Sequence, residues 1–187
     1  HQQESFIILY VGMFVPVKGL DILVDALSNW QNEVNWKCVL VGDGPEKSTI
    51  IDSIHHSGLD RQFIFAGSQE ASRIPVWMQA ADLLVLPSRS EGRPNVAIEA
   101  QACGIPVVAT RVGGTAEIVN DGTTGLLVDP ENSVALEAAL TSLKCDEDLR
   151  KQMGQNAYVK LKEKGLTWEE NATKLHEIYE ELLARKV

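Results

Sequence analysis

Short runs of apolar residues alternate along this chain with longer segments in which apolar residues recur every three or four positions. A continuous apolar run is typical of a strand buried on both faces, and the three-to-four spacing is typical of an amphipathic helix. Strands and helices that alternate throughout predict an α/β fold, with a doubly wound, mostly parallel sheet and helices on both faces. The predicted strands cover residues 6–11, 38–41, 63–66, 83–86, 105–109 and 125–128.

The stretch between residues 83 and 109 is the most informative part of the sequence. Its first strand ends at Pro87, a polar loop follows, Pro94 stands at the expected first position of a helix, and Gly104 is expected to end that helix. In a parallel sheet such a loop lies at the carboxyl edge, where open α/β folds bind ligands. Backbone N–H groups at a helix start have no partner within the helix and can cradle a phosphate. Here these groups belong to Gly92, Arg93, Asn95 and Val96.

Two carboxylates flank this helix start. Glu91 stands in the loop, and Glu99 lies about 7 Å along the helix axis from Pro94. A diphosphate at the mouth of the helix would therefore have a carboxylate on each side. The simpler alternative is that Glu91 caps the helix and that Glu99 is a solvated charge.

The block from residue 87 to 109 resembles, almost residue by residue, the E-x7-E signature of retaining glycosyltransferases of the group-1, or family-4, type. These enzymes use nucleotide-sugar donors and have two facing Rossmann-like domains, the GT-B architecture. The resemblance covers the chain from about residue 6 to 183 and corresponds to the C-terminal, donor-binding half. It implies transfer of a glycosyl group from a nucleoside-diphosphate sugar to an acceptor, with retained anomeric configuration.

The resemblance implies how the donor diphosphate is bound. The loop 12–19 is similar to the first donor-site loop of the family, in which a lysine before a glycine contacts the diphosphate, and Lys18 matches that lysine. An arginine usually follows the first glycine, Gly12, but Met13 stands there. Arg93 replaces a residue that is commonly apolar, and it could partly restore the lost charge.

The resemblance also assigns the sugar end of the site. Glu91 would orient sugar hydroxyls, Glu99 would accept from the ribose, and the glycine pair at 113–114 would turn the chain close to the sugar. Lys18 and Glu91 are therefore the expected catalytic residues. Charge and helix N–H groups, rather than a metal, would stabilise the leaving diphosphate, so we expect no metal and no cofactor.

Two further loops are implied more weakly. Gly42 and Gly44 follow a strand and resemble a G-x-G-P element near the donor cleft, and the alternative on local grounds is a plain tight turn. Ser68 and Gln69 occupy a loop that lies beside the nucleobase in the family. The donor-binding residues implied in all are Gly12, Gly42, Gly44, Ser68, Gln69, Gly92, Arg93, Pro94, Asn95, Val96 and Glu99.

Three other functions compete with an active transferase. Met13 favours a glycosyltransferase-like domain that has lost activity and serves as a scaffold. A nicotinamide-dependent oxidoreductase would need a third glycine where Lys47 stands. A sugar-phosphate epimerase of similar layered fold would act without a separate acceptor.

Composition narrows the remaining choices. The net charge of −9 argues against sequence-independent binding to nucleic acid or to anionic membranes. No apolar run approaches the roughly 20 residues that span a bilayer, and no signal peptide opens the chain. The three cysteines have no CxxC spacing and indicate a reduced, cytoplasmic setting rather than a disulfide framework or zinc site.

The domain organisation follows from the same resemblance. We expect residues 1–187 to form one nucleotide-sugar-binding domain, cut from a longer protein whose N-terminal acceptor domain is absent. An amphipathic helix is expected at about 168–185, which in the family crosses back onto that partner domain.

Overall fold

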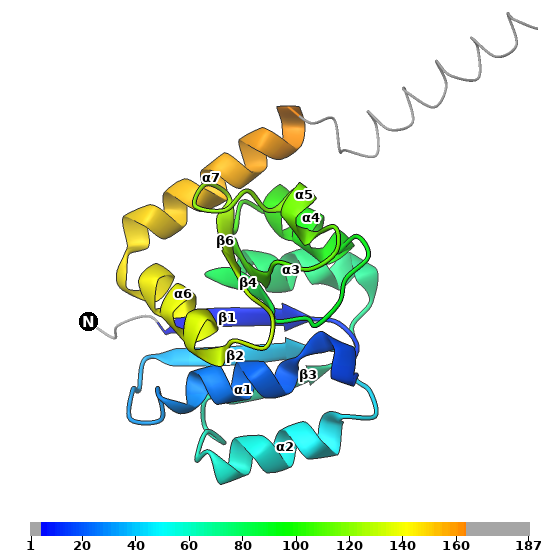
Figure 1. Ribbon diagram of the computed structural model, residues 1–187, viewed down its shortest axis with the longest axis vertical. Coiled ribbons are helices and arrows are strands. Elements are labelled where there is room, and N and C mark those ends of the chain that lie inside the picture. The colour runs from blue at the N-terminus through cyan, green and yellow to red at the C-terminus, as the bar shows by residue number, and fades with distance from the viewer. Residues whose placement is uncertain (1–4, 164–187) are drawn as a thin grey trace, which may run out of the picture.

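The computed structural model describes residues 5–163 of this chain. They form a sheet of six parallel strands in the order β3-β2-β1-β4-β5-β6 (Figure 1). The doubly wound parallel sheet predicted from the apolar runs is confirmed. The strands are β1 (Phe6–Val11), β2 (Trp36–Val41), β3 (Phe63–Gly67), β4 (Leu83–Leu86), β5 (Val107–Thr110) and β6 (Gly125–Val128).

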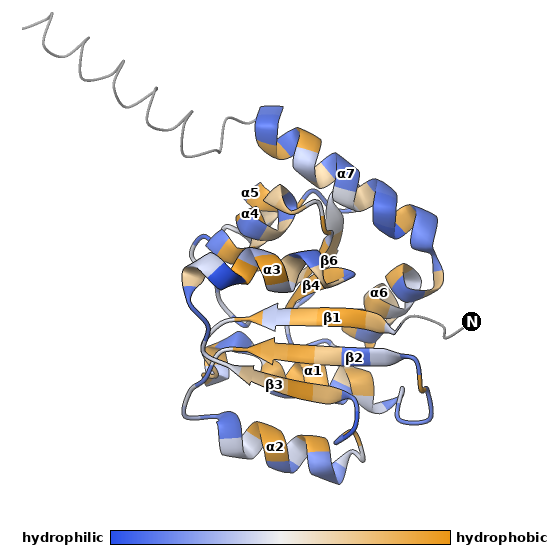
Figure 2. Ribbon diagram, turned by 180° about the vertical axis from the view of Figure 1, so that it is seen from behind, coloured by the Kyte–Doolittle hydropathy of each residue, from blue (hydrophilic) through white to orange (hydrophobic). Residues whose placement is uncertain are grey.

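Helices cover both faces of the sheet, and each face has its own apolar core (Figures 1 and 2). Because side chains alternate across a strand, Ile8 and Tyr10 of β1 enter one core while Leu9 enters the other. The first core holds α1 (Leu20–Ser28), α2 (Lys47–His56) and α6 (Ser133–Cys145), and the second holds α3 (Ile74–Gln79), α4 (Asn95–Ala102) and α5 (Thr115–Ile118). The last described helix, α7 (Glu147–Glu163), packs on α4 and α6.

The order of the strands reverses between β1 and β4. The chain winds outward from β1 through β2 to β3, and then returns to β4 on the other side of β1. The register pairs Ile8 with Leu83 and Leu9 with Leu84, so the carboxyl ends of β1 and β4 lie next to each other. The two loops that leave these ends therefore diverge around a crevice, the place where open α/β sheets bind ligands.

Among the local expectations, the end of α4 is confirmed, whereas its first residue and the start of the strand predicted at 105–109, which begins at Val107, differ. Gly104 has φ +72°, the left-handed conformation that ends α4 as expected. Pro94, however, is the residue that precedes α4, with φ −73° and ψ 93°, rather than its first helical residue. The residue before a helix adopts extended ψ because the chain enters the helix there from a loop. The helix expected at 168–185 lies outside the described residues.

Over residues 5–163, no helix is both long enough and apolar enough to cross a bilayer.

Candidate functional site

The loop after β1 and the loop after β4 bring Lys18 and Glu91 together at the crevice. Lys18 ends the short 3-10 turn η1 (Pro16–Lys18), and its Nζ donates to Glu91 Oε1 at 2.7 Å. The Glu91 side chain is 9% exposed and the Lys18 side chain 27% exposed, so the pair is largely removed from water while an approach to Lys18 stays open. The two residues expected to be catalytic are thus in direct contact across 73 positions of sequence.

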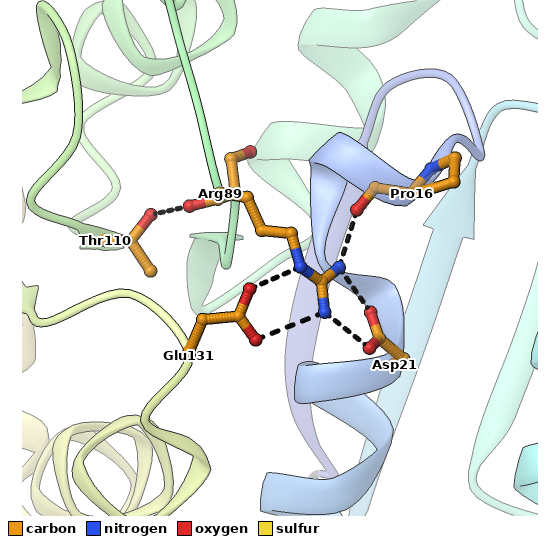
Figure 3. Close-up of polar contacts among 6 residues, drawn as sticks. Pro16, Asp21, Arg89, Thr110 and Glu131 are labelled. Carbon is orange, nitrogen blue, oxygen red and sulfur yellow. Dashed lines mark hydrogen bonds and ion pairs between the residues drawn. The ribbon is translucent and has the colours of Figure 1, made fainter.

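Glu91 is fixed by neighbours other than Lys18. Fully buried Ser88 donates from Oγ to Glu91 Oε1 at 2.7 Å. Thr110, at the end of β5, donates from Oγ1 to the carbonyl of Ser88 at 2.5 Å, which ties the loop to the sheet (Figure 3). The alternative in which Glu91 caps α4 is not supported, because its carboxylate engages Lys18 and Ser88 instead of helix N–H groups.

Tyr10 supports the backbone of the other loop, the one that follows β1. Its hydroxyl donates to the carbonyl of Met13 at 2.9 Å, and its ring packs near Phe14. Burial, with the nearby charge of Glu91 adding to it, raises the pKa of Tyr10 and keeps the phenol neutral. The sequence analysis missed Tyr10, although a tyrosine within a buried strand needs a partner for its hydroxyl.

The helix start offers the N–H groups that the sequence predicts. Within residues 5–163, the N–H groups of Gly92, Arg93, Asn95 and Val96 donate to no protein acceptor. Gly92, Arg93 and Asn95 are exposed, and Pro94 is buried beneath them. The first turn of α4 therefore presents unpartnered donors and the positive end of its dipole beside Glu91.

Glu99 lies further along α4 and has a different environment. It is exposed at the surface, and no group among residues 5–163 forms a hydrogen bond or ion pair with its carboxylate. Partial burial of its carboxyl raises the pKa of Glu99. An acceptor without a partner is suited to a hydroxyl ligand. The expected contact with the ribose stays a prediction.

The glycines at the crevice allow backbone segments to approach closely. A Cβ on Gly42, whose φ is +141°, would lie 1.9 Å from the carbonyl oxygen of Gly12, and one on Gly44 would lie 2.4 Å from that of Phe14. Phe14 in turn donates from its N–H to the carbonyl of Asp43 at 2.9 Å. Gly42 and Gly44 thus have a structural role in joining two loops, and their contact with a donor stays a prediction.

The glycine pair at 113–114 lies against Glu91 and Gly92. The N–H of Gly114 donates to the carbonyl of Gly92 at 2.8 Å, and a Cβ on Gly113, with φ +50°, would lie 1.6 Å from the carbonyl oxygen of Glu91. The β5–α5 loop therefore supports the backbone that carries Glu91.

Ser68 and Gln69 are not brought to the Lys18–Glu91 pair. They follow β3, which is three strand spacings, about 14 Å, from β4. Ser68 is exposed, and Gln69 donates from Nε2 to the carbonyl of Ala66 in its own loop at 2.7 Å. They lie at the same carboxyl edge of the sheet, but β1 and β2 separate their strand from β4.

Met13 and Arg93, the two departures from the family pattern, both face solvent. Met13 is 63% exposed and Arg93 is also exposed. No contact joins the two side chains, so the restoration by Arg93 of the charge lost at Met13 stays a hypothesis.

Arg89 is the main residue that the sequence analysis missed. Its guanidinium lies between two carboxylates, Asp21 in the first turn of α1 and Glu131 in the loop before α6 (Figure 3). Hydrogen bonds to Asp21 and then to Glu131 raise the pKa of Arg89, and the Arg89 hydrogen bond lowers the pKa of Asp21. No local pattern indicates this residue, because its partners lie 68 and 42 positions away.

Two other features bear on the chemistry. In the part of the chain described, no three His, Cys, Asp or Glu side chains are grouped so that they could hold a metal ion. A hollow of about 910 Å³ lies at the opposite, amino edge of the sheet, beside Phe6, Asp82 and Pro106. The charged groups of this hollow include the Arg150–Asp82 pair at 3.1 Å. Its lining includes neither Lys18 nor Glu91.

Fold and site together define a doubly wound α/β protein whose ligand edge carries a lysine–carboxylate pair beside an open helix start. The sequence profile of the glycosyl transferases group 1 family matches residues 1–160. This chain belongs to that family.

Individual relatives agree with this assignment. An uncharacterized glycosyltransferase of Methanocaldococcus jannaschii is 38% identical over 93% of this chain, which covers 48% of that protein. The C-terminal domain of a group 1 family glycosyl transferase of Francisella tularensis superposes with a TM-score of 0.77 at 31% identity, covering 84% of this chain and 85% of that one. HepE of Anabaena, solved in complex with UDP-glucose, gives a TM-score of 0.79 at 30% identity over 85% of this chain and 44% of its own. The chain thus spans about half the length of the curated relatives it matches.

Proposed function

We propose that this chain is the nucleotide-sugar-binding domain of a glycosyltransferase that moves a glycosyl group from a nucleoside-diphosphate sugar to an acceptor. The observation that carries the proposal is the Lys18–Glu91 contact of 2.7 Å, where the loops after β1 and β4 diverge. Beside it lie the N–H groups of Gly92, Arg93, Asn95 and Val96, which have no partner among residues 5–163. The similarity to a protein solved with UDP-glucose supports the same ligand class.

The proposed mechanism is electrostatic. A donor diphosphate at the start of α4 accepts hydrogen bonds from the N–H groups of Gly92, Arg93, Asn95 and Val96. The positive charge of Lys18 partly neutralises it. As the bond to the sugar breaks, negative charge builds up on the diphosphate, and these fixed donors stabilise it without a metal ion. Lys18 shares its charge between the phosphate and Glu91.

The two carboxylates have separate tasks in this proposal. Glu91 has one oxygen held by Lys18 and Ser88, and its second oxygen accepts from a sugar hydroxyl. The Glu99 carboxylate, which has no hydrogen-bond partner in the part of the chain that the structure describes, accepts from the ribose. The transferred sugar retains its anomeric configuration, as the family resemblance implies.

The wider protein is also part of the proposal. Residues 1–187 form one donor-binding unit, and an N-terminal domain, consistent with the half-length match to relatives, supplies the acceptor site. The whole enzyme acts in the cytoplasm, and this domain by itself binds the donor but transfers little.

Calorimetric titration with UDP, GDP and ADP, with and without Mg²⁺, tests the proposal. We expect saturable binding of one nucleotide that is insensitive to Mg²⁺ and is strongly weakened, but still measurable, in Lys18→Ala. Lys151→Ala is the matched control, since Lys151 forms an exposed i,i+4 pair with Glu147 on α7. Equal binding in both variants would refute the assigned site.

A second candidate, a catalytically inactive scaffold domain, is favoured by Met13. It would leave the assembled full-length protein unable to hydrolyse or transfer from any nucleotide sugar, even where nucleotide still binds.

A further inference from the structure

Arg89 joins three loops at the carboxyl edge of the sheet (Figure 3). On one side, Nη1 donates to Asp21 Oδ1 at 2.9 Å and Nη2 donates to Oδ2 at 2.7 Å. On the other side, Nε donates to Glu131 Oε1 at 2.5 Å and Nη2 donates to Oε2 at 3.3 Å. The planar guanidinium is suited to two such forked contacts, and the point charge of a lysine is not.

The same residue holds the turn that carries Lys18. Arg89 Nη1 donates to the carbonyl of Pro16 at 2.6 Å, and the Arg89 backbone N–H donates to the carbonyl of Val17 at 2.8 Å. Both residues that precede Lys18 are therefore bound to one residue that lies two positions before Glu91. The contacts from Arg89 to Pro16 and Val17 therefore fix the backbone beside Lys18 relative to the backbone beside Glu91.

Glu131 contributes a carboxylate from an unusual backbone conformation. Its φ of 58° is the only positive φ of a non-glycine residue among residues 5–163. Residues other than glycine keep this conformation where the surrounding structure imposes it. Here it accompanies two hydrogen bonds that Arg89 donates to the Glu131 carboxylate.

The number of hydrogen bonds distinguishes two roles for Arg89, direct binding of a phosphate and positioning of neighbouring residues. A guanidinium has five N–H donors, and the five contacts to Pro16, Asp21 and Glu131 use all of them. No donor is left for a phosphate. Exposed ion pairs add little stability one by one, so the consequence of this network is geometric.

We propose that Arg89 is a positioning residue that sets the geometry of Lys18 and Glu91 for the donor diphosphate. This inference rests on the proposed function for its effect on binding. If release of the network leaves the two loops in the binding geometry about a tenth of the time, affinity falls about tenfold, because apparent affinity scales with the competent fraction.

The test compares UDP, GDP and ADP affinities of Arg89→Gln, Arg89→Lys and the control Arg111→Gln. Arg111 lies at the same edge and forms a single ion pair with Asp121 at 2.7 Å. We expect about a tenfold loss in both Arg89 variants and no change in the control. Full rescue by Arg89→Lys would overturn the proposal, because charge alone would then account for the effect.

Two further variants distinguish positioning from long-range charge. Glu131→Gln removes a negative charge, so charge alone would tighten nucleotide binding, whereas positioning predicts that binding weakens. In a Lys18→Ala background, Arg89→Gln is expected to have much less effect than in the unsubstituted chain, because a positioning residue acts through its partner. Equal effects in both backgrounds would overturn the proposal.

Amide hydrogen exchange gives a readout that needs no nucleotide. The N–H groups of Lys18 and Gly19 donate within η1, to Val15 and Pro16. Arg89→Gln should speed their exchange about tenfold and leave core strand amides unchanged. If the unsubstituted chain binds no nucleotide, the proposed function fails, and exchange alone then decides: faster exchange supports the positioning role, and unchanged exchange overturns it.

Discussion

Replacement of Lys18 by methionine tests the electrostatic logic of the site through folding alone. Methionine keeps much of the side-chain length but leaves the Glu91 carboxylate without its cation, with only the Ser88 hydroxyl as donor. Exposed pairs contribute about 0–1 kcal/mol, and breaking a fully buried pair costs about 3–5 kcal/mol. With side-chain exposures of 27% for Lys18 and 9% for Glu91, this pair lies between these limits, so we expect a loss of about 2 kcal/mol.

Urea unfolding followed by tryptophan fluorescence measures this loss. Trp30 and Trp36 are buried and stack edge to face 5.4 Å apart in the core, so their emission reports on global unfolding. A loss of about 2 kcal/mol corresponds to a melting temperature lower by roughly 4–8 °C for a chain of this size.

The double variant Lys18→Met/Glu91→Gln is the decisive control. The neutral amide oxygen of glutamine still accepts from Ser88, and no charge is left unpaired. We expect the double variant to recover most of the lost stability. A Lys18→Met loss below about 0.5 kcal/mol, or a double variant as unstable as the single one, would refute the reasoning, because the pair would then behave as an ordinary surface contact.

Three further predictions concern nucleotide binding, backbone conformation and pH. Glu99→Gln should weaken nucleotide binding by on the order of 1.5–3 kcal/mol in calorimetry, the contribution of hydrogen bonds to a charged acceptor, and unchanged affinity would show that Glu99 is only a solvated charge. Gly104→Val should destabilise the chain by about 1–2 kcal/mol in urea unfolding, because φ is +72° there, and Gly92→Ala, at a glycine without positive φ and with open space around it, is the control. The Arg89 hydrogen bond lowers the folded pKa of Asp21 below 3.8, so its contribution to stability is present above that pH and is lost as pH falls through the folded pKa. Acid titration of unfolding should therefore show a smaller decline below about pH 4 in Arg89→Gln, and an unchanged decline would contradict the pairing.

The sequence by itself determined the order and type of the elements. Each buried strand is a local apolar run, and each helix shows its own three-to-four spacing, so both follow from side-chain periodicity within a few residues. The positions of Lys18 and Glu91 in loops at the ligand edge followed as well, since the carboxyl ends of parallel strands share one edge. The end of α4 at Gly104 was also predicted correctly, whereas the cap position of Pro94 and the start of the strand predicted from residue 105, which begins at Val107, were misplaced.

Tertiary structure decided how the site is held together. The contact between Lys18 and Glu91 depends on β1 and β4 being neighbours, which strand composition does not specify. The role of Arg89 and the close approach of Gly113 to Glu91 join residues that are far apart in the sequence. Such contacts leave no periodic signal, because they arise only when the chain has folded and packing fixes which loops meet.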